Sequence, residues 1–146
     1  DACISGHLDV VSWLHEQGVS LDVVATNGYH LIHTACNNGR LEVARWLHEQ
    51  GVSLNTPGNS GRRPIHYACI HGHLDIAKWL YTQSASLDVA DIDGWRPIHH
   101  ACRKGNLQVA KWLHEQGVAL DVADNDGWYP MHHACADGYL QVAKWL

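Results

Sequence analysis

The chain has 146 residues, of which 46% are hydrophobic, and a formal net charge of −5 when histidine is neutral. This length suits one domain or one short repeat array, and the apolar content argues against a disordered chain. An acidic chain lacks the basic face with which nucleic-acid-binding proteins neutralise phosphates. No apolar run approaches the roughly 18 residues that span a bilayer, and no signal peptide is visible. We therefore expect neither a nucleic acid nor a membrane as a partner.

The cysteines recur at a fixed interval of 33 residues, and a tryptophan and a glycine in each copy keep the same step. A fixed period of this length indicates stacked copies of one small unit rather than a single folded core. The cysteines are Cys3, Cys36, Cys69, Cys102 and Cys135. We expect a single array over 1–146, with a partial unit at 1–27, units at 28–60, 61–93 and 94–126, and a partial unit at 127–146. Because both ends fall inside a unit, we expect this array to be a segment of a longer protein.

Each unit is predicted to contain two helices followed by an extended loop. In the copy that starts at Gly94, Pro97 suits the first position of a short helix that ends near Lys104, before Gly105. A second helix begins at Leu107, and its apolar residues are spaced to form one wide face. Gly117 follows this helix at the place of a left-handed cap, and the turn-rich segment 121–126 leads to the next unit.

Two irregularities interrupt this pattern. Ser84 stands where the other copies have the capping glycine, so we expect a strained left-handed residue there. In the loop 55–60, Pro57 and Gly58 predict a rearranged turn.

The unit resembles the ankyrin repeat, whose first helix carries the segment T-P-L-H-x-A. That segment is present here as RPIHYA (63–68), RPIHHA (96–101), YPMHHA (129–134) and HLIHTA (30–35), and a G-H-L-x-x-V-like segment follows, as in GHLDVV (6–11). The threonine before the proline is absent from every copy. The resemblance implies an all-α, helix–turn–helix solenoid with short β-hairpin loops. It also implies a non-catalytic protein–protein interaction module whose first-helix histidines are structural and bond the loop backbone.

The cysteines favour a reducing compartment. Their number is odd, and each follows an alanine at the same place in the unit, so we expect free, buried thiols and an intracellular protein, cytoplasmic or nuclear.

A metal site or a thiol–imidazole pair is the alternative use of these side chains. His99 and Cys102 are three residues apart and are therefore neighbours on a helix. One unit supplies only two such ligands, however, and helices of adjacent units lie about 8–10 Å apart, which is too far to complete a zinc shell. We expect no metal, no cofactor and no enzymatic activity.

Partner-binding residues are expected where the copies differ while the scaffold agrees. These positions are the variable pair at the end of the first helix, the loop tips and the residue after the structural histidine. They comprise Asn37, Asn38, Tyr67, Ile70, His71, Ile92, Trp95, Arg96, His100, Arg103, Lys104, Asn125, Trp128, Tyr129, His133 and Asp137.

Several features of this surface remain open at the level of sequence. Arg103 and Lys104, with Arg96 and Trp95 nearby, form a basic and aromatic patch suited to an acidic peptide. Trp95 and Trp128 either contact a partner or only pack on the adjacent hairpin. We expect a monomer that binds another protein or peptide through a concave groove and its loop tips. The alternative is a structural spacer, or the targeting arm of a larger multidomain protein such as an enzyme or a ligase adaptor.

Overall fold

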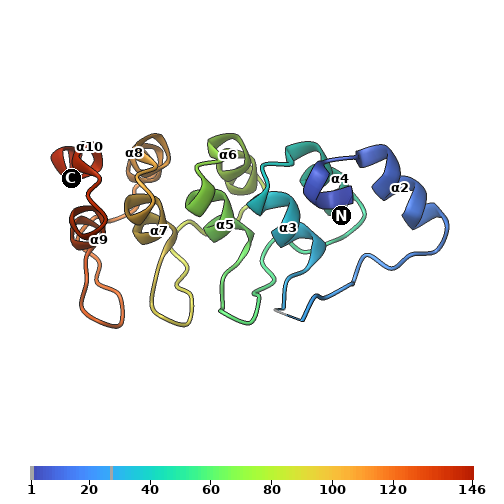
Figure 1. Ribbon diagram of the computed structural model, residues 1–146, viewed down its shortest axis with the longest axis horizontal. Coiled ribbons are helices and arrows are strands. Elements are labelled where there is room, and N and C mark those ends of the chain that lie inside the picture. Colours follow the sequence, from blue (N-terminus) through green and yellow to red (C-terminus); the bar gives the residue numbers. More distant parts are fainter. Residues whose placement is uncertain (1, 27) are drawn as a thin grey trace.

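The computed structural model describes residues 2–26 and 28–146, and within these residues it contains helices but no extended strands (Figure 1). The helices are α1 (Ala2–Ser5), α2 (Leu8–Glu16), α3 (Leu31–Asn37), α4 (Leu41–Glu49), α5 (Pro64–His71), α6 (Leu74–Thr82), α7 (Pro97–Arg103), α8 (Leu107–Glu115), α9 (Pro130–Ala136) and α10 (Leu140–Trp145). The predicted all-α solenoid of paired helices is therefore confirmed. None of these helices is both long and apolar enough to cross a membrane.

The helices form two parallel rows. The first helices of the units, α3, α5, α7 and α9, pack side by side, and each also packs on the second helix of its own unit. The hairpin loops project together from the row of first helices, away from the second helices (Figure 1). We call the surface made by the hairpins and the carboxyl ends of the first helices the groove face. The exposed surface of α4, α6 and α8 is called the second-helix face.

The first helices start without a hydroxyl cap. In each complete copy the backbone N–H before the helix donates to Nδ1 of the histidine three residues later, as from Arg96 to His99 at 3.0 Å. Pro64, Pro97 and Pro130 occupy the first helical position, where a missing N–H costs nothing. The histidine thus accepts the N–H of the residue before the helix, while its own backbone N–H donates to the carbonyl of that residue, as from His99 to Arg96 at 3.0 Å.

The second helices end on a left-handed residue, as predicted. Gly51 and Gly117 have φ of 89° and Gly18 has 86°, and Ser84 adopts φ of 66° at the same place. Only glycine populates this region without strain, so Ser84 is the strained member of the set.

The hairpins keep one backbone pattern throughout. In the hairpin after α6, the Asp91 amide donates to the Trp95 carbonyl and the Gly94 amide donates to the Asp91 carbonyl. The loop with Pro57 makes the same two bonds from Gly58 and Gly61. The predicted rearranged turn is therefore wrong. Pro57 precedes the first of these donors, so its missing N–H removes no bond of the hairpin.

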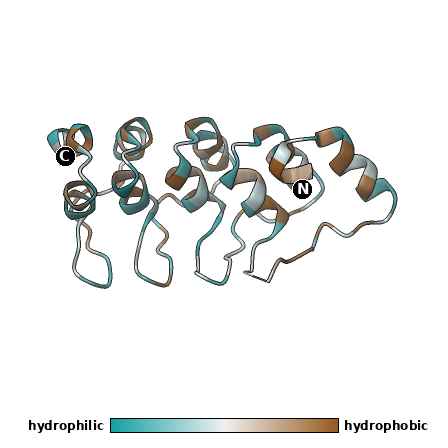
Figure 2. Cartoon of the chain, in the orientation of Figure 1, coloured by the Kyte–Doolittle hydropathy of each residue, from teal (hydrophilic) through white to brown (hydrophobic). Residues whose placement is uncertain are grey.

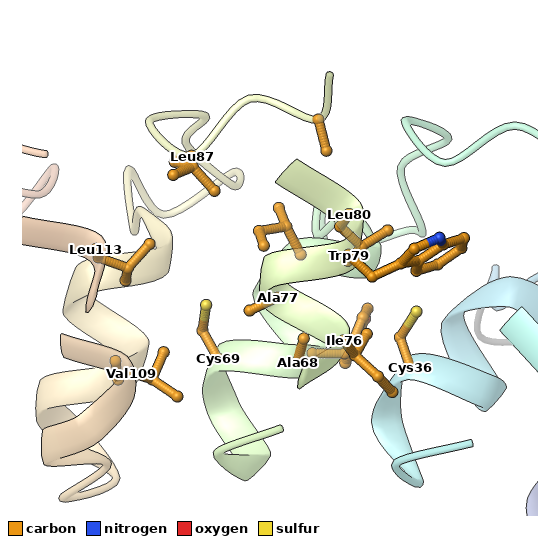
Figure 3. Packing of buried hydrophobic residues seen from close by; sticks show 14 of the residues in the cluster. Cys36, Ala68, Cys69, Ile76, Ala77, Trp79, Leu80, Leu87, Val109 and Leu113 are labelled. Carbon is orange, nitrogen blue, oxygen red and sulfur yellow. The ribbon is translucent and has the colours of Figure 1, made fainter. Parts of the chain in front are cut away.

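The core lies between the rows and between neighbouring units (Figure 3). Trp79 is 8% exposed and Ala77 is fully buried, and Trp112 and Ala110 repeat this pairing. The small alanine leaves room for the ring at close-packed density. Figure 2 shows hydrophobic and hydrophilic residues on the helices of every unit, as expected for helices with one face in the core.

Four of the five cysteines are free and buried, as predicted, but Cys135 is exposed. Cys69 points from α5 toward α8 of the following unit (Figure 3). Cys135 lies at the same place in the helix pair α9 and α10. The prediction of a buried thiol in every copy is therefore wrong for this residue.

Candidate functional site

The first-helix histidines tie each helix to the loop that follows. His33, His66 and His99 are fully buried. Their Nε2 atoms donate to the carbonyls of Thr56, Val89 and Val122 at 2.8, 3.0 and 2.9 Å. Burial lowers the pKa of His33 and His66 to about 4, so both are neutral at pH 7. Because both ring nitrogens are engaged, these side chains have no lone pair left for a metal or a substrate proton.

The buried cysteines are unsuited to nucleophilic chemistry. Burial raises the pKa of the Cys102 thiol to about 12 and raises the pKa values of Cys36 and Cys69 as well. A catalytic cysteine needs a lowered pKa and access to solvent. Within the described part of the chain, no three histidine, cysteine or acidic side chains are placed to hold a metal ion.

The histidines that follow the structural ones are buried as well. His100 is 4% exposed and His133 is 6% exposed. Nε2 of His100 lies 3.0 Å from Oδ2 of Asp91, and Nε2 of His133 lies 2.8 Å from Oδ2 of Asp124. These two side chains therefore brace the hairpins from inside, and their contact with a partner stays a prediction.

Asp91 is the most heavily bonded of these carboxylates. Its Oδ1 accepts from the amides of Asp93 and Trp95, at 3.1 and 2.9 Å, and its Oδ2 also accepts from Nε of Arg62 at 3.1 Å. Burial on its own raises the pKa of Asp91, but the bonds from His100, Arg62 and the Trp95 amide outweigh it and lower the pKa below its usual value. The charged carboxylate thus holds the hairpin in shape.

Tyr67 occupies the corresponding position in an earlier copy and is 2% exposed. Its ring packs on the rings of Tyr29 and His33, with centroids 4.9 and 5.5 Å apart. Tyr67 therefore packs in the interior between hairpins, and its contact with a partner stays a prediction.

Trp95 packs between two units. Its ring lies 5.0 Å from that of His100 and 4.2 Å from that of His133. The guanidinium carbon of Arg103 lies over it at 4.8 Å, and Nε of Arg103 donates to Asp137 at 3.2 Å. Of the two interpretations of Trp95, the structure therefore favours packing. The positive charge of the expected basic patch is reduced, because the carboxylate of Asp137 is paired with Arg103.

The remaining predicted positions differ in exposure. Asn37, Asn38, Ile70, Trp95 and Arg96 are half-buried. The exposed positions are His71, Ile92, Arg103, Lys104, Asn125, Trp128, Tyr129 and Asp137.

A hollow of about 290 Å³ opens on the groove face between the last two units. It brings together Trp95, Arg103, Trp128, His133 and Asp137 from the predicted set. It also contains Asp124, Asp126 and Ala136, which sequence reasoning missed. A signal for Asp124 was present, because the second histidine occurs only in the two copies that have aspartate at this hairpin position.

Comparison with known families agrees with this architecture. A model described as ankyrin repeats (3 copies) matches residues 1–91, and a second, described as ankyrin repeats (many copies), matches residues 81–114 and 98–146. No curated protein matches the chain significantly. The chain belongs to the ankyrin repeat family, whose members are generally non-catalytic modules for protein–protein interaction.

Proposed function

We propose that this array is a recognition module that binds a partner protein or peptide on its groove face. The observation that supports this most directly is the group of large, exposed, copy-specific side chains on the last two hairpins. Ile92 is 64% exposed, Trp128 44% and Tyr129 41%, whereas the tryptophans Trp79 and Trp112 inside the array are at most 8% exposed. Large exposed apolar and aromatic side chains dominate the energetics of protein interfaces.

The scaffold supports this use because the same hairpin backbone carries different side chains in successive copies. In a solenoid each unit contacts only its neighbours, so a change on the groove face affects adjacent units alone, as where Nδ2 of Asn125 donates to the Ile92 carbonyl at 3.1 Å. Asn125 and Ile92 occupy the same place on successive hairpins, with very different chemistry. The face therefore offers a rigid, extended set of independent contacts, which costs little ordering entropy on binding.

The expected acidic partner has less support than the groove itself. Lys104 is exposed, and none of the ion pairs of the described residues involves it. Arg103, in contrast, is paired with Asp137. Any preference for an acidic segment would therefore rest on Lys104 alone.

A matched pair of double variants tests the proposal. Lys104→Glu with Asn125→Glu alters the groove face, and Lys78→Glu with Gln116→Glu makes the same charge changes on the second-helix face; all four residues are exposed. Captured proteins are quantified by mass spectrometry after equal thermal stability has been confirmed. The groove variant is expected to lose partners that wild type and the second-helix variant retain. If wild type and both double variants capture the same proteins, the groove is not the recognition surface. That result would favour the alternative function, a structural spacer or a module that acts through flanking segments.

A further inference from the structure

The hollow between the last two units is lined by both aromatic and acidic side chains. Trp95 and Trp128 supply aromatic surface, and Asp124, Asp126 and Asp137 supply three carboxylates against the single guanidinium of Arg103. Two of these carboxylates already have a partner: Asp124 is paired with His133, and Asp137 is paired with Arg103. Asp126 is exposed, and although its amide donates to Oδ1 of Asp124, its own carboxylate makes no ion pair or hydrogen bond within the described residues. The hollow therefore retains unpaired negative charge beside an aromatic ring.

Arg103 shows how this part of the molecule accommodates a cation. Its guanidinium stacks over Trp95 at 4.8 Å and is held by the Asp137 carboxylate at 3.2 Å. The two contacts are complementary, because the face of the indole attracts positive charge while the planar fork of the guanidinium bonds the carboxylate. Trp128 and Asp126 supply the same two kinds of group to the lining of the hollow, with Trp128 44% exposed.

The space for a ligand comes from one substitution between copies. Ala136 stands where the previous unit has Arg103, and it lines the hollow. A methyl group in place of a long cationic side chain leaves the hollow open on that side. Trp128 consequently has no guanidinium of this chain over its ring among the described residues, whereas Trp95 has one.

We propose that this hollow binds the side chain of an arginine presented by a partner, with the guanidinium against Trp128 and its N–H groups directed at Asp126. Arginine fits better than lysine because a flat, delocalised cation stacks on an indole while it bonds a carboxylate, and an ammonium does so less well. The inference rests on the proposed function only in placing the partner on the groove face. It assigns a basic rather than an acidic segment to the end of that face.

Titration of the ¹⁵N-labelled chain with acetyl-Gly-Arg-Gly-amide tests the proposal, with the indole N–H signals of the seven tryptophans as readout. The signal of Trp128 is assigned from its disappearance in Trp128→Phe. The control peptide contains citrulline, which keeps the shape of arginine without its charge. We expect saturable shifts at Trp128 with the arginine peptide and none with citrulline.

Variants of single residues test which carboxylate binds the arginine peptide. Asp126→Asn is expected to weaken binding of the arginine peptide about fivefold, the loss that corresponds to one exposed ion pair. Asp93→Asn, which changes the exposed aspartate at the same place on the previous hairpin, is expected to leave binding unchanged. Ala136→Arg fills the hollow from within and is expected to abolish binding.

Three outcomes would overturn the assignment: equal shifts with arginine and citrulline, shifts confined to tryptophans other than Trp95 and Trp128, or full binding by Asp126→Asn. Loss of the arginine effect with intact capture of partner proteins by the groove face would remove this inference and leave the recognition function in place. If arginine binding is intact but capture no longer depends on the groove face, the arginine site stands and the proposed recognition function is removed.

Discussion

Ser84 departs from its glycine counterparts while keeping their conformation. It holds φ of 66° at the end of α6, although the space around the matching Gly51 and Gly117 is empty. Because an L residue is strained in the left-handed region, the cost lies in the backbone and not in a clash.

Replacing Ser84 by glycine should therefore stabilise the array by about 0.5–1 kcal/mol, since glycine removes that strain. Urea denaturation of the two proteins measures the difference in free energy of unfolding. Gly117→Ser is the matched control and should destabilise by a similar amount. An unchanged or lower midpoint for Ser84→Gly would show that Ser84 is not under strain.

Asp91 is bonded by residues that are distant in the sequence, so its role could not be predicted from the sequence alone. The carboxylate accepts two backbone amides, Arg62 and His100 at once, from residues up to 29 positions away. Asp91→Asn should cost about 3–5 kcal/mol, because it removes one partner of a buried charge network. Asp93→Asn, two residues away and exposed, should fall within about 0.5 kcal/mol of wild type. Thermal melts of both variants would decide, and equal melting temperatures would contradict the bracing role of Asp91.

At the scale of the helices, the period and apolar spacing predicted almost everything that the structure shows. The short helix expected from Pro97 to Lys104 is α7, Pro97–Arg103, and the second helix begins at Leu107 as expected. The sequence did not predict that the hairpin containing Pro57 keeps the common pattern, because this depends on which amide donates and not on composition. It also did not reveal that His100 and His133 turn inward, because that requires knowledge of the opposing aspartates.

Position in the array, rather than residue type, sets what a tryptophan contributes. Trp79 and Trp13 occupy the same place in their second helices, yet Trp79 is 8% exposed and Trp13 is 56% exposed. Trp79→Ala should cost about 3–5 kcal/mol, as expected for a large-to-small change in a core. Trp13→Ala should cost less than about 1 kcal/mol, since its ring has little contact area to lose. Chemical denaturation gives both values, and similar losses would mean that α2 is packed as tightly as α6.

At the scale of the whole molecule, the repeated buried histidines predict instability in acid. His33 and His66 have folded pKa values lowered from 6.5 to about 4 by burial, so the unfolded chain binds more protons between these values. Each contributes stability that is present above pH 6.5 and is lost as the pH falls toward 4, up to about 3 kcal/mol at 1.36 kcal/mol per pKa unit. Burial lowers the pKa of His99 and His100 in the same direction.

Urea midpoints at pH 7.5 and pH 5 measure this effect. The midpoint should fall at the lower pH, and His66→Gln should show a smaller fall than wild type while being less stable at pH 7.5. If the midpoint did not change between the two pH values, these histidines would not be held in the neutral form by burial.

The division between a uniform scaffold and a variable groove face is the central claim, and photo-cross-linking tests it most directly. A photoreactive phenylalanine analogue is placed at Ile92 or Asn125 on the hairpins, or at Lys78 or Glu115 in the second helices; all four positions are exposed. With a partner captured by the wild-type chain, cross-links are expected from Ile92 and Asn125 and not from Lys78 and Glu115. Cross-links from the second-helix positions, with none from the hairpins, would contradict recognition through the groove face.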